Sequence, residues 1–247
     1  MKKMIFHLLI VSSYNCYAND KLKLYTERIN NGFNIYAYNY EFCSMSVFIE
    51  FDLLNMRNLN KENKVYVLEP SKKRQLLTTL KVKIHSKPYQ FNFRYGTNYG
   101  NNNNKSYDFD YPYHLHFENG VSFKVSQGYN NKSTHYGINE NSIDFSMPVG
   151  TKVTALSEGV VVKVIDYNTK NCNQKECLKY NNIVLVYHDD DTLAGYLHLK
   201  EIHLKEKGAS VKVGDKVTKG QVIDLTVNTG WSSGPHLHVR LYKQFLG

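Results

Sequence analysis

The sequence lacks an apolar run of the roughly 20 residues that a membrane-spanning helix needs. It has only 5 prolines, and from Asn119 onward no stretch of ten or more residues has the spacing of an amphipathic helix. Although the formal net charge is +9, lysine and arginine form no dense cluster. These absences argue against a membrane span, a helical bundle and a nucleic-acid partner. A basic protein of this kind would instead be attracted to anionic polymers or surfaces.

What the chain does have is tyrosine, with 20 residues, and short runs in which apolar and polar residues alternate. This pattern favours strands and predicts an all-β fold. We expect a signal segment at 1–18, a β-rich accessory domain at 19–110 and a barrel-like or sandwich-like domain at 111–247. The range 96–106 is rich in Gly and Asn and predicts a loop. The predicted strands are 45–51, 64–68, 80–85 and 89–95, followed by 159–164, 183–188, 192–199 and 237–242.

The first 18 residues have the features of a secretory signal peptide. Two lysines precede an apolar run from Met4 to Val11, and Ala18 is a small residue at the expected cleavage point. A buried N-terminal strand and a lipid-modified Cys16 are the alternatives. The signal peptide predicts a periplasmic or secreted protein.

Two of the four cysteines, Cys172 and Cys177, are close in sequence. In an oxidising compartment this spacing is typical of a disulfide that closes a small loop. A zinc knuckle is the rival interpretation, but no second Cys or His pair lies nearby. Cys43 is left over and is expected to be a small buried apolar residue.

Histidine is frequent, with ten residues, and occurs twice as a His-Leu-His triplet. In a strand the two histidines of such a triplet point to the same side, so they can converge on one site. The first triplet is His114-Leu-His116 and the second is His236-Leu-His238. The second follows a polar turn and lies near further His and acid candidates. It is therefore predicted to be functional, and the first is predicted to be structural.

Catalytic zinc sites use three protein ligands and keep one position open. Asp144 lies between Ile143 and Phe145, where a buried carboxylate would need a cation. A metal ion would answer that need, and an Arg or Lys partner is the alternative. His135 lies nine positions upstream, and the intervening loop can return the chain to the same place. His198 lies on a predicted strand, where a lone His is more often structural.

Taken together, these residues resemble the lysostaphin-type, LytM-like zinc endopeptidases, whose domain has a duplicated hybrid motif fold. The likeness covers about 110–239, roughly half of the chain. It rests on the order of five matching stretches, which is more specific than any single triplet. These stretches are 125–135, 143–153, 195–199, 213–221 and 232–238, and Gly159-Val-Val resembles the strand after the second one.

The resemblance implies a role for each matching residue. His135, Asp144 and His238 would bind one zinc ion, while His198 and His236 would be the catalytic residues beside it. The implied reaction is hydrolysis, by zinc-activated water, of the peptide stems that cross-link bacterial peptidoglycan. The D-alanyl to diaminopimelyl bond is the expected target, and glycine bridges are the other bond that the family cleaves.

Two other functions are compatible with the same residues. One is a non-catalytic LytM-like module that binds and activates a cell-wall amidase, and the other is a peptidase that acts on host or competitor proteins. The chain departs from the family at Val239-Arg240, where most members have Phe-Glu. This change places a base, in place of an acid, beside the site. The sequence does not indicate the oligomeric state.

Overall fold

A computed structural model describes residues 21–60, 65–106, 108, 110–201 and 209–244. The chain divides into two compact units, with the division between Asn104 and Lys105. This boundary lies six residues before the boundary that the sequence predicted, between residues 110 and 111. The predicted signal segment at 1–18 lies outside the described residues.

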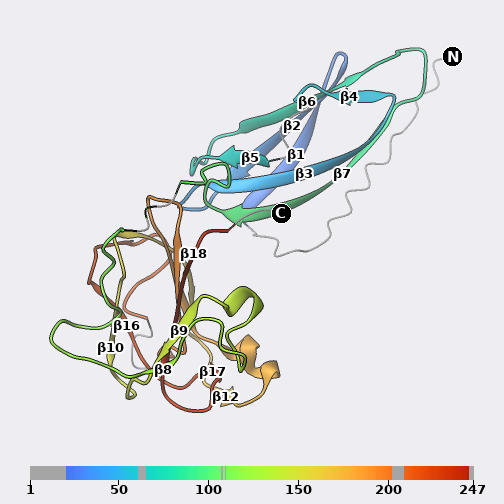
Figure 1. Ribbon diagram of the computed structural model, residues 1–247. Coiled ribbons are helices and arrows are strands. Elements are labelled where there is room, and N and C mark those ends of the chain that lie inside the picture. The colour runs from blue at the N-terminus through green and yellow to red at the C-terminus, as the bar shows by residue number, and fades with distance from the viewer. Residues whose placement is uncertain (1–20, 61–64, 107, 109, 202–208, 245–247) are drawn as a thin grey trace. The chain divides into compact units, whose positions relative to one another are not determined.

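The first unit consists of two antiparallel sheets, as Figure 1 shows. Their facing apolar residues form the core of this unit, and Ile35, Val47 and Leu80 are fully buried in it. The larger sheet has the order β1-β2-β6-β4 and the smaller has the order β5-β3-β7. The strands are β1 (Leu22–Ile29), β2 (Gly32–Asn39), β3 (Met45–Leu54), β4 (Met56–Asn58), β5 (Val65–Leu68), β6 (Gln75–Val82) and β7 (Gln90–Tyr99).

Two predictions for this unit were wrong at element boundaries. The run predicted as a strand at 80–85 belongs to β6, which begins earlier and ends at Val82, because β6 pairs along most of β2. The predicted loop at 96–106 begins too early, since β7 continues to Tyr99. Gly96 lies opposite Phe48, and Tyr99 lies opposite Met45. Pairing with a long neighbouring strand therefore overrides the local loop composition.

The second unit is built on a seven-stranded sheet with the order β15-β11-β13-β14-β18-β9-β8. Each pair of neighbours is antiparallel. The described sheets are not closed into a barrel, so the all-β prediction is confirmed without barrel closure. The sheet contains β8 (Val125–Gln127), β9 (Ser142–Phe145), β11 (Gly159–Ile165), β13 (Ile183–Tyr187), β14 (Leu193–Leu197), β15 (Lys216–Val217) and β18 (Leu237–Tyr242).

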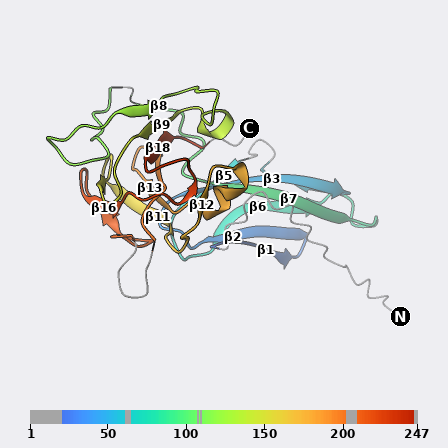
Figure 2. The same cartoon turned by 90° about the horizontal axis from the view of Figure 1, so that it is seen from below.

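Smaller elements surround this sheet. An antiparallel pair joins β10 (Lys152–Thr154) to β16 (Val222–Leu225), and a parallel pair joins β12 (Asn171–Cys172) to β17 (Gly230–Trp231). The described helices are two short 3-10 helices, η1 (Gly137–Asn139) and η2 (Lys175–Tyr180). None of the described helices is long and apolar enough to span a bilayer. Figure 2 shows β8, β9 and β18 side by side at one part of the sheet.

The two faces of the seven-stranded sheet differ in their residues. One face packs on the apolar core of the unit, to which Val186, Tyr196 and Val239 belong. Because side chains alternate along a strand, His238 and Arg240 point to the opposite face. The hydroxyl oxygen of the buried Tyr196 accepts a hydrogen bond from the backbone N–H of Leu156 at 2.8 Å. The core face thus anchors the strands whose other face carries the histidines.

The structure confirms both predictions for the cysteines. Cys172 and Cys177 form a disulfide, and Cys43 is free and buried. The disulfide loop begins in β12, which pairs with β17. The backbone N–H of Trp231 donates to Oδ1 of Asn181, so this loop region holds the chain that leads to the His-Leu-His triplet.

Gly230 of β17 is the glycine whose replacement tests this connection. Its φ is +81°, and a Cβ there would lie 1.6 Å from Asn181 Oδ1. Gly230→Ala should lower the free energy of unfolding by about 3 kcal/mol or more, because left-handed strain and steric overlap add. Gly234→Ala is the matched control, since a Cβ there meets nothing within 4 Å. Urea unfolding measures both, and equal stability of the two variants would contradict the packing described here.

Candidate metal and catalytic site

The centre of the site is a cross-strand pair between β9 and β18. Asp144 lies directly opposite His238 in the antiparallel register. The Oδ1 atom of Asp144 is 2.9 Å from Nδ1 of His238, and both side chains are buried. The strand pairing alone therefore brings together two residues that are 94 positions apart in sequence.

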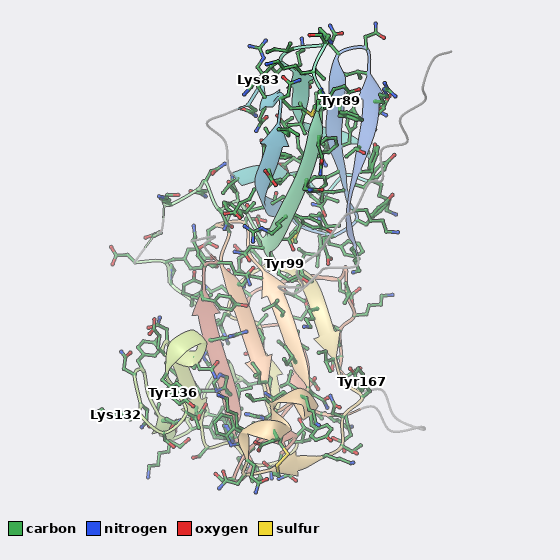
Figure 3. The ribbon with its side chains drawn as sticks, turned by 90° about the vertical axis from the view of Figure 1, so that its right-hand side faces the viewer. Lys83, Tyr89, Tyr99, Lys132, Tyr136 and Tyr167 are labelled. Carbon is green, nitrogen blue, oxygen red and sulfur yellow. A yellow bond between two sulfur atoms is a disulfide. The ribbon has the colours of Figure 1, made fainter. Side chains whose placement is uncertain are left out.

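His135 joins this pair from the loop between β8 and η1. Its side chain is fully buried, and its Nδ1 is 2.9 Å from the carbonyl oxygen of Gly128. A carbonyl only accepts, so Nδ1 carries a proton, and the neutral form of the ring presents a lone pair at Nε2. That Nε2 atom is 3.2 Å from Asp144 Oδ1 and makes no hydrogen bond among the described residues. Figure 3 labels Lys132 and Tyr136 on the same segment, outside the sheet.

A lone pair that faces a carboxylate oxygen at this distance is repulsive unless a cation lies between them. One candidate ligand atom from each of His135, Asp144 and His238 lies within 4.8 Å of the other two. The spacings of 3.2 and 2.9 Å are near the roughly 3.3 Å between two ligand atoms of a tetrahedral zinc ion. All ion-pair partners of Asp144 among the described residues are histidines. The Arg or Lys alternative is thus not realised there, and the residues fit a metal ion.

Gln127 is a contact of the carboxylate that sequence reasoning missed. Its Nε2 donates a hydrogen bond of 2.9 Å to Asp144 Oδ2, from the last position of β8. This bond holds one carboxylate oxygen while the other faces the histidines. Outer contacts of this kind orient metal ligands. A Gln in a Ser-Gln-Gly stretch carries no distinguishing signal, and only the β8–β9 pairing identifies it.

The other two candidate histidines lie beside this cluster. The ring centroids of His198 and His236 are 4.4 Å apart, and those of His198 and His238 are 6.1 Å apart. His198 Nδ1 is 2.6 Å from the carbonyl oxygen of Thr229, and His236 Nδ1 is 2.8 Å from that of Gly234. Each carbonyl requires a proton at Nδ1, so both neutral rings present Nε2 as an acceptor. His236 Nε2 is 3.8 Å from Asp144 Oδ2.

Burial and charge determine the protonation of these groups. Burial raises the pKa of Asp144, but the hydrogen bond from His238 and the neighbouring histidines lower it below its usual value overall. Burial lowers the pKa of His198 to about 3, with a smaller contribution from the charges of His236 and His238. Burial also lowers the pKa of His238. These shifts favour a carboxylate at Asp144 and neutral imidazoles at His198 and His238, and such forms are the ones that bind metal ions.

The remaining histidine candidates lie apart from the cluster. His116 is buried against the rings of Phe145 and Tyr196, whereas a Cβ at Gly220 would touch the ring of His114. His188 Nδ1 is 2.9 Å from Thr192 Oγ1. None of the three belongs to the described group of potential ligands. The second triplet, and not the first, thus lies at the cluster.

Comparison with known protein families gives a match to the second unit. Residues 138–245 match the sequence model described as Peptidase family M23. This range includes Asp144, His198, His236 and His238, while His135 precedes it by three positions.

Individual relatives match over similar lengths. A Vibrio cholerae protein named peptidoglycan DD-endopeptidase ShyA is 38% identical over 101 residues, which are 41% of this chain and 20% of that protein. An uncharacterised metalloprotease of Buchnera aphidicola is 32% identical over 122 residues, 49% of this chain and 28% of its own length. The chain thus spans less than a third of these relatives. The catalytic domain of the prophage-encoded M23 protein EnpA from Enterococcus faecalis is 28% identical, with a TM-score of 0.38 over 51% of this chain and 85% of that domain.

Removal of any one ligand should abolish metal retention. His135→Ala, Asp144→Ala and His238→Ala should each lower the zinc content of the purified protein from about one ion per chain to near zero, because two remaining ligands hold zinc weakly. Plasma emission spectroscopy measures the content. His114→Ala is the control and should keep its zinc. Full zinc content in all three ligand variants would rule out the cluster as the metal site.

His116 provides a pH test of the structural role of the first triplet. Burial, and to a smaller extent the charge of His114, lowers its pKa to about 4. Unfolding restores a value near 6.5, so the unfolded chain binds the proton first and stability falls as the pH drops from about 6.5 to 4. In metal-free protein, His116→Phe should reduce this loss by up to roughly 3 kcal/mol. Urea unfolding at several pH values measures this loss of stability. If the free energy of unfolding depends on pH equally in both proteins, the burial of a neutral His116 is contradicted.

Proposed function

We propose that this chain, whose residues 138–245 form a domain of peptidase family M23, is a zinc metalloendopeptidase that hydrolyses the peptide cross-links of bacterial peptidoglycan. The proposal rests on one observation: His135 Nε2 lies 3.2 Å from the Asp144 carboxylate, and His238 Nδ1 lies 2.9 Å from it. Two further imidazoles, whose Nδ1 atoms face backbone carbonyls, lie next to this cluster. The ligand set and the paired bases together suit hydrolysis of a peptide bond.

Zinc is the metal that we propose, because two imidazole nitrogens and one carboxylate oxygen are a set of donors that it favours. When bound, zinc polarises a carbonyl and lowers the pKa of a bound water to about 7. The chain supplies Gln127 and the Gly128 carbonyl, which orient Asp144 and His135. Such contacts keep the ligands in place before a metal arrives.

His198 and His236 are proposed to move protons. Each is held through Nδ1 by a backbone carbonyl, so its Nε2 can accept a proton from the attacking water. A protonated imidazole can then donate to the developing oxyanion or to the leaving amine. Both rings are anchored in the same way, so the anchoring alone does not distinguish the two roles.

The substrate proposal rests on the similarity to proteins that are named peptidoglycan endopeptidases. We favour the D-alanyl to diaminopimelyl cross-link over glycine bridges, as the name of the Vibrio relative describes a DD-endopeptidase. Without Lys2 and Lys3 of the predicted signal segment, the net charge is 9 − 2 = +7, which would draw the protein to anionic wall polymers. The N-terminal features of a signal peptide support a periplasmic or secreted location, where this substrate occurs.

The catalytic assignment predicts a separation of metal binding from turnover. His198→Ala and His236→Ala should keep about one zinc ion per chain but lose turnover by about 100- to 10,000-fold, since each removes a proton acceptor and no ligand. Release of muropeptides from purified walls, followed by mass spectrometry, measures the activity and identifies the bond cleaved.

Controls separate this function from its rivals. His114→Ala should digest walls at the rate of the unchanged protein, and chelation should stop digestion. A protein without zinc that releases no muropeptides, but that stimulates a wall amidase, would support the binding module. Faster cleavage of casein than of walls would indicate a peptidase for other proteins.

A further inference from the structure

The sheet face that carries Asp144 and His238 has a second cross-strand pair further along β9 and β18. Arg240 follows His238 by two positions on β18, and Ser142 precedes Asp144 by two positions on β9. Arg240 and Ser142 are directly opposite each other in the register. Since alternate residues share a face, both side chains point to the side of the sheet that carries Asp144 and His238. They lie about 7 Å along the strands from that pair.

Each side chain has one buried donor atom without a partner, while the rest of the Arg240 guanidinium also interacts with the side chain of Tyr242. The Nε atom of Arg240 and the Oγ atom of Ser142 are buried, and neither makes a hydrogen bond among the described residues. No carboxylate in the described ranges forms an ion pair with Arg240. Buried donors of this kind are unfavourable until an acceptor reaches them, and a guanidinium favours a carboxylate in particular.

The surroundings keep the guanidinium in place. Its Cζ atom is 4.6 Å from the centre of the Tyr242 ring. On its other side Arg240 faces Gly195 of β14, where a Cβ would lie only 3.3 Å from Arg240 Nε. The missing side chain at Gly195 lets the arginine lie over the neighbouring strand. A donor that is already oriented loses less entropy when it binds an acceptor.

We propose that Arg240 and Ser142 bind a free carboxylate of the substrate peptide, on a residue adjacent to the bond that is cleaved. This inference rests on the proposed function and adds a specificity determinant to it. In the D-alanyl to diaminopimelyl link, the carbon that bears the acylated amine also bears a carboxylate. A glycine bridge has no such group. The pair therefore selects links with a free carboxylate over amidated links and glycine bridges.

Two cross-linked muropeptide dimers test this selection, one with the free diaminopimelyl carboxylate and one with its amide. The zinc-loaded full-length protein should hydrolyse the free form with a kcat/KM about 10- to 100-fold higher, as hydrogen bonds to charged groups contribute in that range. Arg240→Gln should remove this preference by slowing cleavage of the free form alone. Arg240→Lys should keep only part of it, because an ammonium lacks the planar fork. Ser142→Ala should reduce the preference by a smaller factor.

Controls separate recognition from folding. Arg57→Gln removes one positive charge from an exposed position of β4 and should leave the preference unchanged. All Arg240 and Ser142 variants should keep the zinc content of the unchanged protein. A preference that survives in Arg240→Gln, or that is absent from the unchanged protein, would overturn the inference and leave Arg240 as a residue that only packs on Tyr242.

A binding measurement distinguishes this inference from the proposed function. Calorimetry on zinc-loaded His236→Ala, with and without Arg240→Gln, should show 10- to 100-fold tighter binding of the free form only when Arg240 is present. That binding result with no hydrolysis by the unchanged protein would refute the proposed function and support the inference. Equal hydrolysis and equal binding of both dimers would refute the inference and leave the proposed function standing.

Discussion

The site depends on one constraint, which is the burial of the charged Asp144 carboxylate. This carboxylate faces Nε2 of His135 at 3.2 Å and Nδ1 of His238 at 2.9 Å. Gln127 donates to Oδ2, and Oδ1 faces the two histidines. A buried anion beside a neutral imidazole nitrogen is favourable when a cation lies between them. The protein supplies no lysine or arginine for this purpose within its described residues, which makes a metal ion the consistent solution.

The sheet makes this arrangement possible because its central strands have two different faces. Tyr196 and Val239 hold β14 and β18 to the core, and the alternate positions remain available for chemistry. Backbone carbonyls of Gly128, Thr229 and Gly234 then fix the tautomers of three histidines. These carbonyls lie in loops that strands β8, β17 and β18 hold in place. Fold stability and the protonation state of the site are thus linked through ordinary backbone hydrogen bonds.

Sequence reasoning identified the chemistry better than the geometry. Strand β18 has the predicted bounds and carries His238, whereas His236 lies just before its first residue, outside the alternation from which the triplet was predicted. The choice of this triplet over His114-Leu-His116 depended on resemblance and context, because spacing is identical in both. The orienting contact of Gln127 and the Ser142–Arg240 pair depend on cross-strand register. A register cannot be read from one strand, so these contacts were accessible only from the structure.

Anomalous diffraction at the zinc absorption edge, from crystals of the purified protein, tests the central claim most directly. We expect a single strong peak about 2.0–2.2 Å from one nitrogen of His135, one nitrogen of His238 and one carboxylate oxygen of Asp144. A fourth position directed towards His198 and His236 should remain open for a small ligand. A zinc peak elsewhere, or an Asp144 carboxylate bound by a lysine or arginine with no metal nearby, would contradict the account.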